Sequence, residues 1–410
     1  MHRAIDAVWR IESAKLIAGL ARIVRDVGLA EDLAQDALVA ALEQWPESGI
    51  PRNPGAWLMA TAKHRAIDVL RRRERLERKH GELAREGQAS DERAERALDD
   101  DFGDDLLRLV FVACHPVLST DARVALTLRL LGGLTTQEIA RAFFVSEATV
   151  AQRIVRAKRT LAEARVPFEV PPGPELAPRL SSVLEVLYLI FNEGYSATFG
   201  ADWMRPALCE DALRLGRVLA ELVPAEPEVH GLVALMEIQA SRSRARIGSA
   251  GEPVLLLDQD RLRWDRILVR RGLAALVRAE RLGGALGPYA LQAAIAACHA
   301  RAAAAEETDW TAIAALYDAL AQIAPSPVVQ LNRGVAVAMA FGPAAGLEVV
   351  DALKSEGSLE GYHLLPSVRG DLLAKLGRLG EARSEFEHAA QLTYNARERA
   401  LLLERAAACS

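Results

Sequence analysis

The stretch GLTTQEIARAFFVSEATVAQRIVRAKRTL, residues 133–161, predicts two short helices joined by a tight turn. Thr135, with Glu138 three residues later, forms a capping box that starts the first helix. Ser146, just after the turn at Phe144 and Val145, is an N-cap candidate for the second helix. The expected inner faces are Ile139, Ala140 and Phe143 on the first helix, and Val150 and Ile154 on the second. Such a pair of crossing helices is typical of a helix-turn-helix.

The outward surface of the second helix is polar and basic. It carries Thr149, Gln152, Arg153 and Arg156, whose side chains can hydrogen-bond base edges or phosphates in a DNA major groove. Two alternatives stay open. The hairpin can be ordinary helix packing with a solvated face, or Arg153 and Arg156 can hold phosphates without reading bases.

The composition favours an all-α protein of several domains. The chain has 410 residues, 51% of them hydrophobic but only 5% aromatic, with long runs of Ala, Leu, Arg and Glu. The longest apolar stretch, residues 183–191, is about half the length of a membrane-spanning helix and is expected to be buried core. The charged N-terminus predicts cytoplasmic residence, and the four widely spaced cysteines are expected to be free thiols. Cys114 and His115 are too few ligands for a structural zinc site, so we expect no metal and no cofactor.

Charge is unevenly distributed around a net charge of -5. Residues 63–79 hold eight basic and three acidic side chains, a net of +5, and residues 85–105 hold three basic and nine acidic ones, a net of -6. Residues 141–165 are basic again, at +4. This order indicates two nucleic-acid-facing modules joined by an acidic tether, although three solvated helix faces would give the same pattern.

Residues 4–45 predict two amphipathic helices, the first ending at Val27-Gly28 and the second at Trp45-Pro46. The loop SGIPRNPG, residues 48–55, cannot be crossed by a helix because of its prolines. A third helix is expected from Ala56, and its predicted inner face is Trp57, Ala60, Ile67 and Leu70.

Three stretches in this order resemble one known family. AEDLAQDALVAALEQW, residues 30–45, resembles the sigma factor helix that binds the clamp of RNA polymerase. NPGAWLMATAKHRAIDVLRRRER, residues 53–75, resembles the adjacent helix that melts and reads the promoter -10 element. The helix-turn-helix at 133–161 is similar to the module that reads the -35 element. The chain is therefore identified as a member of the sigma-70 family, extracytoplasmic-function type.

The resemblance implies roles for three sets of residues. Core RNA polymerase is expected to meet Asp32, Gln35 and Asp36. The -10 element is expected to meet Arg52, Asn53, Trp57, Lys63, His64, Arg71, Arg72 and Arg73. The -35 element is expected to meet Ser146, Glu147, Thr149, Gln152, Arg153 and Arg156. His64 stands where many relatives have Asn, which leaves the base preference at the -10 element open.

The implied organisation is a sigma domain 2 at residues 1–79, an acidic linker at 80–105, a sigma domain 4 at 106–165 and a C-terminal helical extension at 166–410. Within the extension, the sequences at 331–334 and 367–370 repeat at an offset of 36 residues, close to the ~34 of tetratricopeptide repeats. LYLIFNEGYSAT and LLLDQDRLRWDR, residues 187–198 and 255–266, also resemble a sigma factor group with such an extension. Asp258 and Asp260 form either a docking patch or a solvated loop.

The function implied is promoter-specific initiation with core RNA polymerase and promoter DNA as partners, modulated by the extension. Whether the extension inhibits or is required, and what the repeats bind, stays open. A helix-turn-helix regulator that never engages polymerase is the alternative, and the stretches at 30–45 and 53–75 count against it. An enzyme is not expected, because the chain has no glycine-rich phosphate loop, no HExxH and no GxSxG.

Overall fold

The computed structural model describes residues 2–80, 102–143, 145–196, 204–248 and 252–409. These residues form eighteen α-helices and a few short 3-10 turns, and no β-strand occurs among them. The all-α prediction is confirmed. The chain divides into two compact units, Met1–Leu187 and Tyr188–Ser410.

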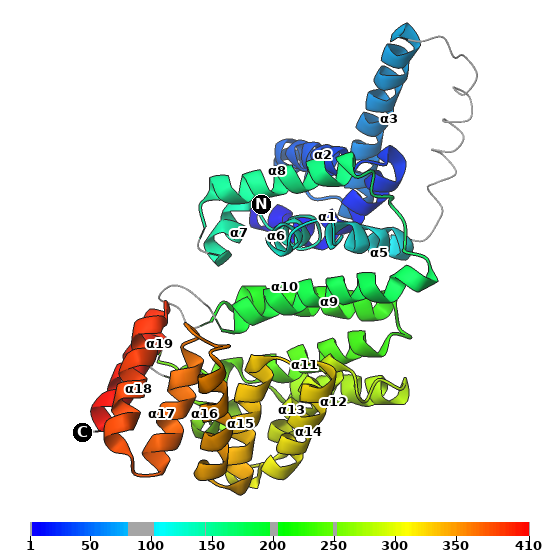
Figure 1. Cartoon of the computed structure of the whole chain (residues 1–410). Coiled ribbons are helices and arrows are strands. Elements are labelled where there is room, and N and C mark those ends of the chain that lie inside the picture. The colour runs from blue at the N-terminus through cyan, green and yellow to red at the C-terminus, as the bar shows by residue number, and fades with distance from the viewer. Residues whose placement is uncertain (1, 81–101, 144, 197–203, 249–251, 410) are drawn as a thin grey trace. The chain divides into compact units, whose positions relative to one another are not determined.

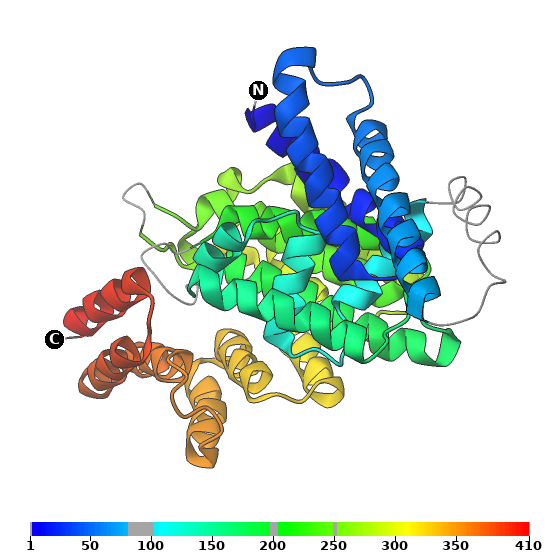
Figure 2. The same ribbon diagram turned by 90° about the horizontal axis from the view of Figure 1, so that it is seen from above.

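The first unit begins with three mutually packed helices, α1 (His2–Val24), α2 (Val27–Ser48) and α3 (Pro54–His80), drawn in blue in Figures 1 and 2. The predicted helix ends were wrong here. Asp26 caps α2 by accepting a hydrogen bond from Leu29 N at 3.0 Å, so Val27-Gly28 starts this helix instead of ending the previous one. Pro46 lies inside α2, and the helix continues to Gly49, whose φ of 81° suits a residue without a Cβ.

The predicted inner face of α3 was also wrong. Leu58, Ala62 and Ala66 are the buried residues, whereas Ala60 is exposed and Trp57 is half-buried. The buried set follows an i, i+4 spacing, whereas Ile67 and Leu70 of the predicted set are half-buried. Small alanines on this face let α3 approach α1 closely, and a Cβ on Gly19 of α1 would lie 2.8 Å from Met59 Cε.

Four further helices of the first unit are α5 (Phe102–Ala113), α6 (Thr120–Leu130), α7 (Thr136–Phe143) and α8 (Glu147–Glu163). Both predicted caps are present: Thr135 N donates to Glu138 Oε2 at 2.8 Å, and Ser146 Oγ accepts from Thr149 N at 3.1 Å. Val150 and Ile154 are buried as expected. The helix-turn-helix is therefore confirmed, apart from Phe144, which lies outside the described residues.

The predicted acidic linker at 80–105 lies mostly outside the described residues, because residues 81–101 are not described. Residues 102–105 belong to α5. Residues 173–187, about two thirds of α9 (Gly173–Tyr195), also belong to the first unit. There Ser182 Oγ donates to Cys114 O at 2.7 Å and Arg179 Nη2 donates to Phe111 O at 2.9 Å, so α9 fastens to the end of α5.

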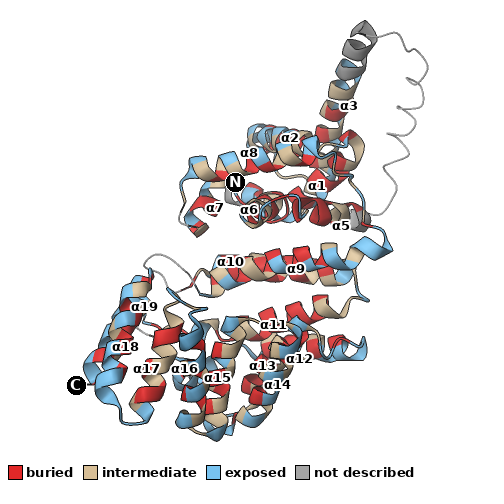
Figure 3. Ribbon diagram, in the orientation of Figure 1, coloured by how far each residue is buried: buried red, intermediate tan, exposed pale blue. Residues whose placement is uncertain are grey.

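The second unit continues from α9 with a first group of helices: α10 (Pro206–Leu222), α11 (Pro227–Ser241), α12 (Arg266–Arg281) and α13 (Pro288–Arg301). A second group follows: α14 (Trp310–Ile323), α15 (Pro327–Phe341), α16 (Pro343–Glu356), α17 (Leu364–Lys375), α18 (Leu379–Leu392) and α19 (Ala396–Ala408). In this second group each helix packs against the next (Figure 1). Exposed residues cover much of α18 and α19 (Figure 3).

The sequence repeat corresponds to a structural one. Gly334 on α15 and Gly370 on α17 both face the following helix closely, and a Cβ on either would lie 3.0 Å from a side chain there, Val350 or Phe386. A glycine at this place lets the two helices of a pair approach. The 36-residue offset thus marks equivalent positions in two stacked helix pairs.

The apolar stretch Val183–Phe191 is largely buried on α9, as predicted. None of the described helices has the length and apolar character needed to cross a membrane. All four cysteines are free thiols. Burial raises the pKa of Cys114 to about 11 and that of Cys209 to about 12, so both stay protonated.

Candidate nucleic-acid interface

The outer face of α8 carries the residues predicted to meet the -35 element. Ser146, Glu147, Gln152 and Arg156 are exposed, and Thr149 and Arg153 are half-buried. Val150, Ile154, Ala157 and Leu161 form the opposite, buried stripe. Because the two sets lie on opposite sides of one helix, α8 is anchored by one face and offers the other to a partner.

Two of these residues already have protein partners. Arg153 Nη2 lies 3.0 Å from Asp121 Oδ2 of α6, and Glu147 Oε1 accepts a hydrogen bond from Thr136 Oγ1 at 3.1 Å. Ser146 serves as the N-cap. Gln152 and Arg156 are therefore the exposed pair best placed to meet DNA without giving up a contact that the structure records.

The residues predicted to meet the -10 element lie at the start and along the outer side of α3. Arg52, Asn53, His64, Arg71 and Arg72 are exposed, Trp57 and Lys63 are half-buried, and the side chain of Arg73 lies outside the described part. Asn53 also has a structural role, because its Oδ1 accepts a hydrogen bond from Ala56 N at 3.0 Å and caps α3. Asp68 is exposed on the same helix and interrupts its positive charge.

Trp57 packs edge-on against the buried Trp45 of α2, with 5.2 Å between ring centroids. This contact fixes the indole plane while leaving part of it open to solvent. A half-exposed ring held in place is suited to stacking on an unpaired base.

The residues predicted to meet polymerase share one side of α2. Asp32 and Asp36 are 72% and 60% exposed, and they lie one helical turn apart. Asp36 Oδ2 lies 3.3 Å from Arg65 Nη1 of α3. Gln35 is half-buried, and its Nε2 donates to Glu31 Oε1 at 2.5 Å, so its amide is directed along α2 and not into solvent.

Glu31 is a central residue that the sequence did not indicate. It is 3% exposed, and its carboxylate meets Arg129 Nε of α6 and Lys158 Nζ of α8, each at 2.6 Å. Burial by itself would raise the pKa of Glu31, but the charges of Lys158 and Arg129 outweigh that effect and hold the pKa below its ordinary value. The helix-turn-helix is thus ion-paired to the helix that carries the predicted polymerase-binding residues.

Other ion pairs also join the first three helices to α5–α8. Asp105, which is buried, lies 2.9 Å from Arg22 Nε and 2.7 Å from Arg108 Nη1. Glu138 of the capping box also meets Arg10 Nη2 at 2.5 Å. The partners Arg22–Asp105 and Arg10–Glu138 lie far apart in the sequence, and no local pattern could have paired them, whereas Arg108 is only three residues from Asp105.

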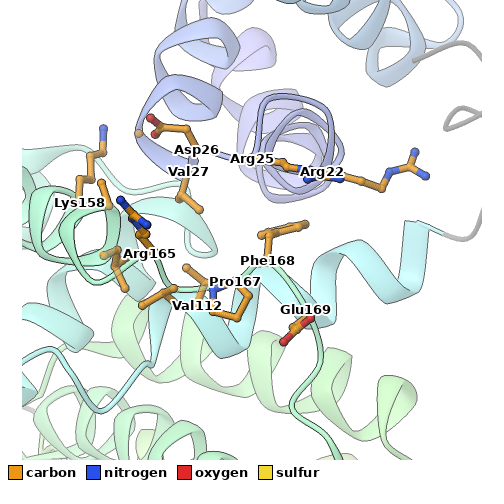
Figure 4. A pocket seen from close by; sticks show the side chains of 14 residues that line it. Arg22, Arg25, Asp26, Val27, Val112, Lys158, Arg165, Pro167, Phe168 and Glu169 are labelled. Atoms are coloured by element: carbon orange, nitrogen blue, oxygen red, sulfur yellow. The ribbon is translucent and has the colours of Figure 1, made fainter. Parts of the chain in front are cut away.

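A groove of about 680 Å³ lies where α1 and α2 meet the end of α8. Arg22, Arg25, Lys158 and Arg165 line it, with the acids Asp26 and Glu169 (Figure 4). Pro167 and Phe168, which follow α8, form its apolar side (Figure 4). Its charge is mainly positive. Within the described part of the chain, no group of three or more His, Cys, Asp or Glu is placed to hold a metal ion.

Known families match three parts of the chain. Residues 12–76 match sigma-70 region 2, which covers most of α1–α3, and residues 108–161 match sigma-70 region 4, which covers most of α5–α8. Residues 179–280 match a family of unknown function, DUF6596.

A protein of Rhizobium meliloti (strain 1021), named only as uncharacterized, is 45% identical over 400 residues, which is 97% of this chain and 94% of that protein. A probable ECF RNA polymerase sigma factor, SigI, of Mycobacterium tuberculosis (strain CDC 1551 / Oshkosh) is 29% identical over 174 residues, which is 42% of this chain and 59% of that protein. The same values hold for SigI of strain H37Rv. The chain therefore belongs to the sigma-70 family, as an extracytoplasmic-function sigma factor with a long C-terminal helical extension.

Proposed function

We propose that this chain binds core RNA polymerase and directs it to promoters, and that its C-terminal helical unit modulates this activity. The observation that carries the proposal is the exposure of three faces on one compact unit: Asp32 and Asp36 on α2, the outer side of α3, and Gln152 and Arg156 on α8. Such a protein acts in the cytoplasm, without catalysis of its own.

Asp32 and Asp36 are proposed to contact basic residues of core polymerase. Their exposure supports this role, because an exposed carboxylate can form a new ion pair without first being taken out of a buried one. Lys158 Nζ lies 3.7 Å from Asp32 Oδ1, so polymerase competes with α8 for this carboxylate. Gln35 is proposed to contact polymerase as well, once its amide has broken its hydrogen bond to Glu31.

Two separate DNA contacts are proposed. Arg52, Asn53, Trp57, Lys63, His64, Arg71, Arg72 and Arg73 are assigned to the -10 element, and Ser146, Glu147, Thr149, Gln152, Arg153 and Arg156 to the -35 element. Trp57 is the residue assigned to stack on a base that leaves the duplex. The lysines and arginines hold phosphates, so binding is expected to weaken steeply with salt.

A promoter-specific run-off transcription assay with purified core polymerase tests the function. The full chain is expected to restore initiation to core enzyme, and a double Asp32→Ala, Asp36→Ala variant is expected to lose both core binding and transcription. Glu163→Ala, an exposed acid at the end of α8, is the matched control and keeps both. A chain that binds promoter DNA but never associates with core enzyme would instead be a helix-turn-helix regulator.

Modulation by the C-terminal unit is tested in the same assay by comparing the full chain with one that ends at Leu187. Higher transcription by the shorter chain would make the second unit an inhibitor, and lower transcription would make it a requirement. Equal core binding and equal transcription by the two chains at the same concentration would contradict any modulation.

A further inference from the structure

A cavity of about 250 Å³ lies inside the second unit. Its lining comes from the end of α9, from α11 and the residue Arg242 that follows it, from the 3-10 turn Leu256–Asp258, and from α13, α14 and α15, and all of the lining residues belong to that unit. Asn192 and Asn332 are exposed, which makes them the mouth of the cavity, whereas Arg242 and His299 are buried, at 8% and 7% exposure. A buried floor with an exposed mouth has the form of a small-molecule site.

Arg242 is the one charged side chain that lines this cavity at neutral pH, and no carboxylate lines it. His299 does not add a second charge, because burial, together with the charges of Arg242 and Arg261, lowers its pKa to about 4. A cavity with one positive charge and no acid favours a ligand with one negative charge and no amino group.

Arg242 is held in place but is not neutralised. Its Nη2 donates to Tyr195 OH at 2.7 Å and to Gln239 Oε1, and its guanidinium lies 5.6 Å from the ring centroid of Trp264. Its Nε has no hydrogen-bond partner, and it forms no ion pair with a carboxylate of the described residues. Burying a guanidinium without a counter-charge costs free energy unless an anion binds to it.

His299 repeats this pattern. Its ring packs edge-on against Trp310, with 5.1 Å between centroids, and its Nδ1 has no hydrogen-bond partner. Thus two buried polar side chains that line the same cavity each keep an unused nitrogen. In folded proteins such groups normally have a partner, which can be a ligand.

The wider surroundings are positive as well. The buried Arg246 lies with its guanidinium 3.6 Å from the ring centroid of Tyr195, and Arg261 donates to Ala302 O at 2.8 Å. The acids that act on Arg261, Glu306 and Glu307, do not line the cavity. The local potential therefore favours an anion.

The remaining lining residues indicate the shape and polarity of the part of the ligand that carries no charge. Tyr188, Phe191, Tyr195 and Tyr317 present aromatic rings, which favour a flat, apolar body. Burial raises the pKa of Tyr317 to about 12, so its hydroxyl stays a neutral donor. The volume equals about eight water molecules at roughly 30 Å³ each. This limits the ligand to about ten non-hydrogen atoms.

We propose that this cavity binds a small aromatic monocarboxylate, with the carboxylate on Arg242 and His299 and the ring among the tyrosines of α9 and α14. A phosphate dianion fits less well, because a single lining cation meets only one of its charges. Binding here is independent of the proposed role in transcription, so one can fail without the other.

Isothermal titration calorimetry of the full chain with benzoate and 4-hydroxybenzoate tests the proposal. Benzamide, which has the shape of benzoate without its charge, is the matched probe and is expected to bind at least tenfold more weakly. Arg242→Gln is expected to weaken benzoate binding tenfold or more, whereas Arg244→Gln, an exposed arginine two residues away, is expected to leave it unchanged.

Because Arg242→Gln removes contacts to Tyr195 and Trp264, it can also loosen the fold, and a second variant is needed. Asn332→Trp lies at the exposed mouth, where it blocks entry without changing the core. Loss of benzoate binding in Asn332→Trp, at an unchanged thermal midpoint, supports the site. The proposal is overturned if benzoate fails to bind, if Asn332→Trp binds it as the natural chain does, or if inorganic phosphate binds more tightly than benzoate.

Discussion

Glu31 shows how one buried carboxylate can hold distant parts of the first unit together. We predict that Glu31→Gln lowers the free energy of unfolding of this unit by about 3–5 kcal/mol, because Arg129 and Lys158 are only 21% and 20% exposed and lose their counter-charge. Hydrogen exchange of the α2 and α8 amides measures the loss. Glu163→Gln breaks only the solvent-exposed pair with Arg159, which contributes little to stability, and serves as the control. Equal losses in the two variants would contradict this role of Glu31.

The same carboxylate predicts a dependence on pH. The pKa of Glu31 is lowered in the folded chain from an ordinary value of 4.5, so the unfolded chain binds this proton more tightly. The stabilisation by Glu31 is therefore complete above pH 4.5 and is lost as the pH falls through the lowered folded value. Urea titrations of the natural chain and Glu31→Gln should give stabilities that converge as the pH is lowered from 6 to about 3. A difference that stays constant over this range would rule out Glu31 as its source.

At the scale of single helices, the role of Ser146 as the cap of α8 can be separated from its proposed role in binding DNA. Ser146→Ala removes the acceptor for Thr149 N and is expected to cost about 1 kcal/mol, seen as faster exchange in the first turn of α8. Ser146→Asn keeps a capping oxygen and should retain the stability. If Ser146→Asn keeps its stability but binds the -35 element more weakly than the natural chain does, the hydroxyl itself contacts DNA. If both variants exchange like the natural chain, the cap contributes nothing measurable.

Two glycines of one helix pair, Gly370 on α17 and Gly380 on α18, are expected to respond differently to substitution by alanine. Gly370→Ala places a Cβ 3.0 Å from the Phe386 ring and 3.2 Å from Ala382 O, which is expected to cost about 1–3 kcal/mol of unfolding free energy. Gly380→Ala on α18 meets nothing within 4 Å and is expected to be neutral or to stabilise by up to about 1 kcal/mol. Urea titrations of the two variants measure both changes in the free energy of unfolding. A Gly370→Ala variant as stable as the natural chain would mean that α17 and α18 can move apart.

Features that depend on a few neighbouring residues could be predicted from the sequence. The capping box at Thr135 and the cap at Ser146 join groups three residues apart, so the residue pattern alone was enough to predict the helix-turn-helix. The inner face of α3 was mistaken, because Trp57 looks like a core residue while small alanines supply the actual contact. The partners of Glu31 are 98 and 127 positions away, and only the tertiary fold brings them together.

At the scale of the whole molecule, the first unit ends within α9. A truncated chain is therefore expected to keep this unit intact only if it includes the part of α9 that belongs to it. This part of α9 covers the end of α5: Ser182 bonds to Cys114 O, Arg179 bonds to Phe111 O, and Glu185 Oε2 lies 3.0 Å from Arg123 Nη1. A chain that stops at Arg165 lacks all three contacts, whereas a chain that stops at Leu187 keeps them. The shorter chain should therefore be the less stable of the two.

Cys114 reports this difference directly. The other cysteines, Cys209, Cys298 and Cys409, are absent from both truncated chains, so any thiol reaction comes from Cys114 alone. Burial raises its pKa to about 11 and keeps it unreactive. We predict that Cys114 stays protected from a thiol reagent such as DTNB in the chain ending at Leu187 and reacts at least tenfold faster in the chain ending at Arg165, as opening of the unit becomes more frequent. Equal protection would show that α5–α8 hold Cys114 without α9, and that the cut at Arg165 is structurally harmless.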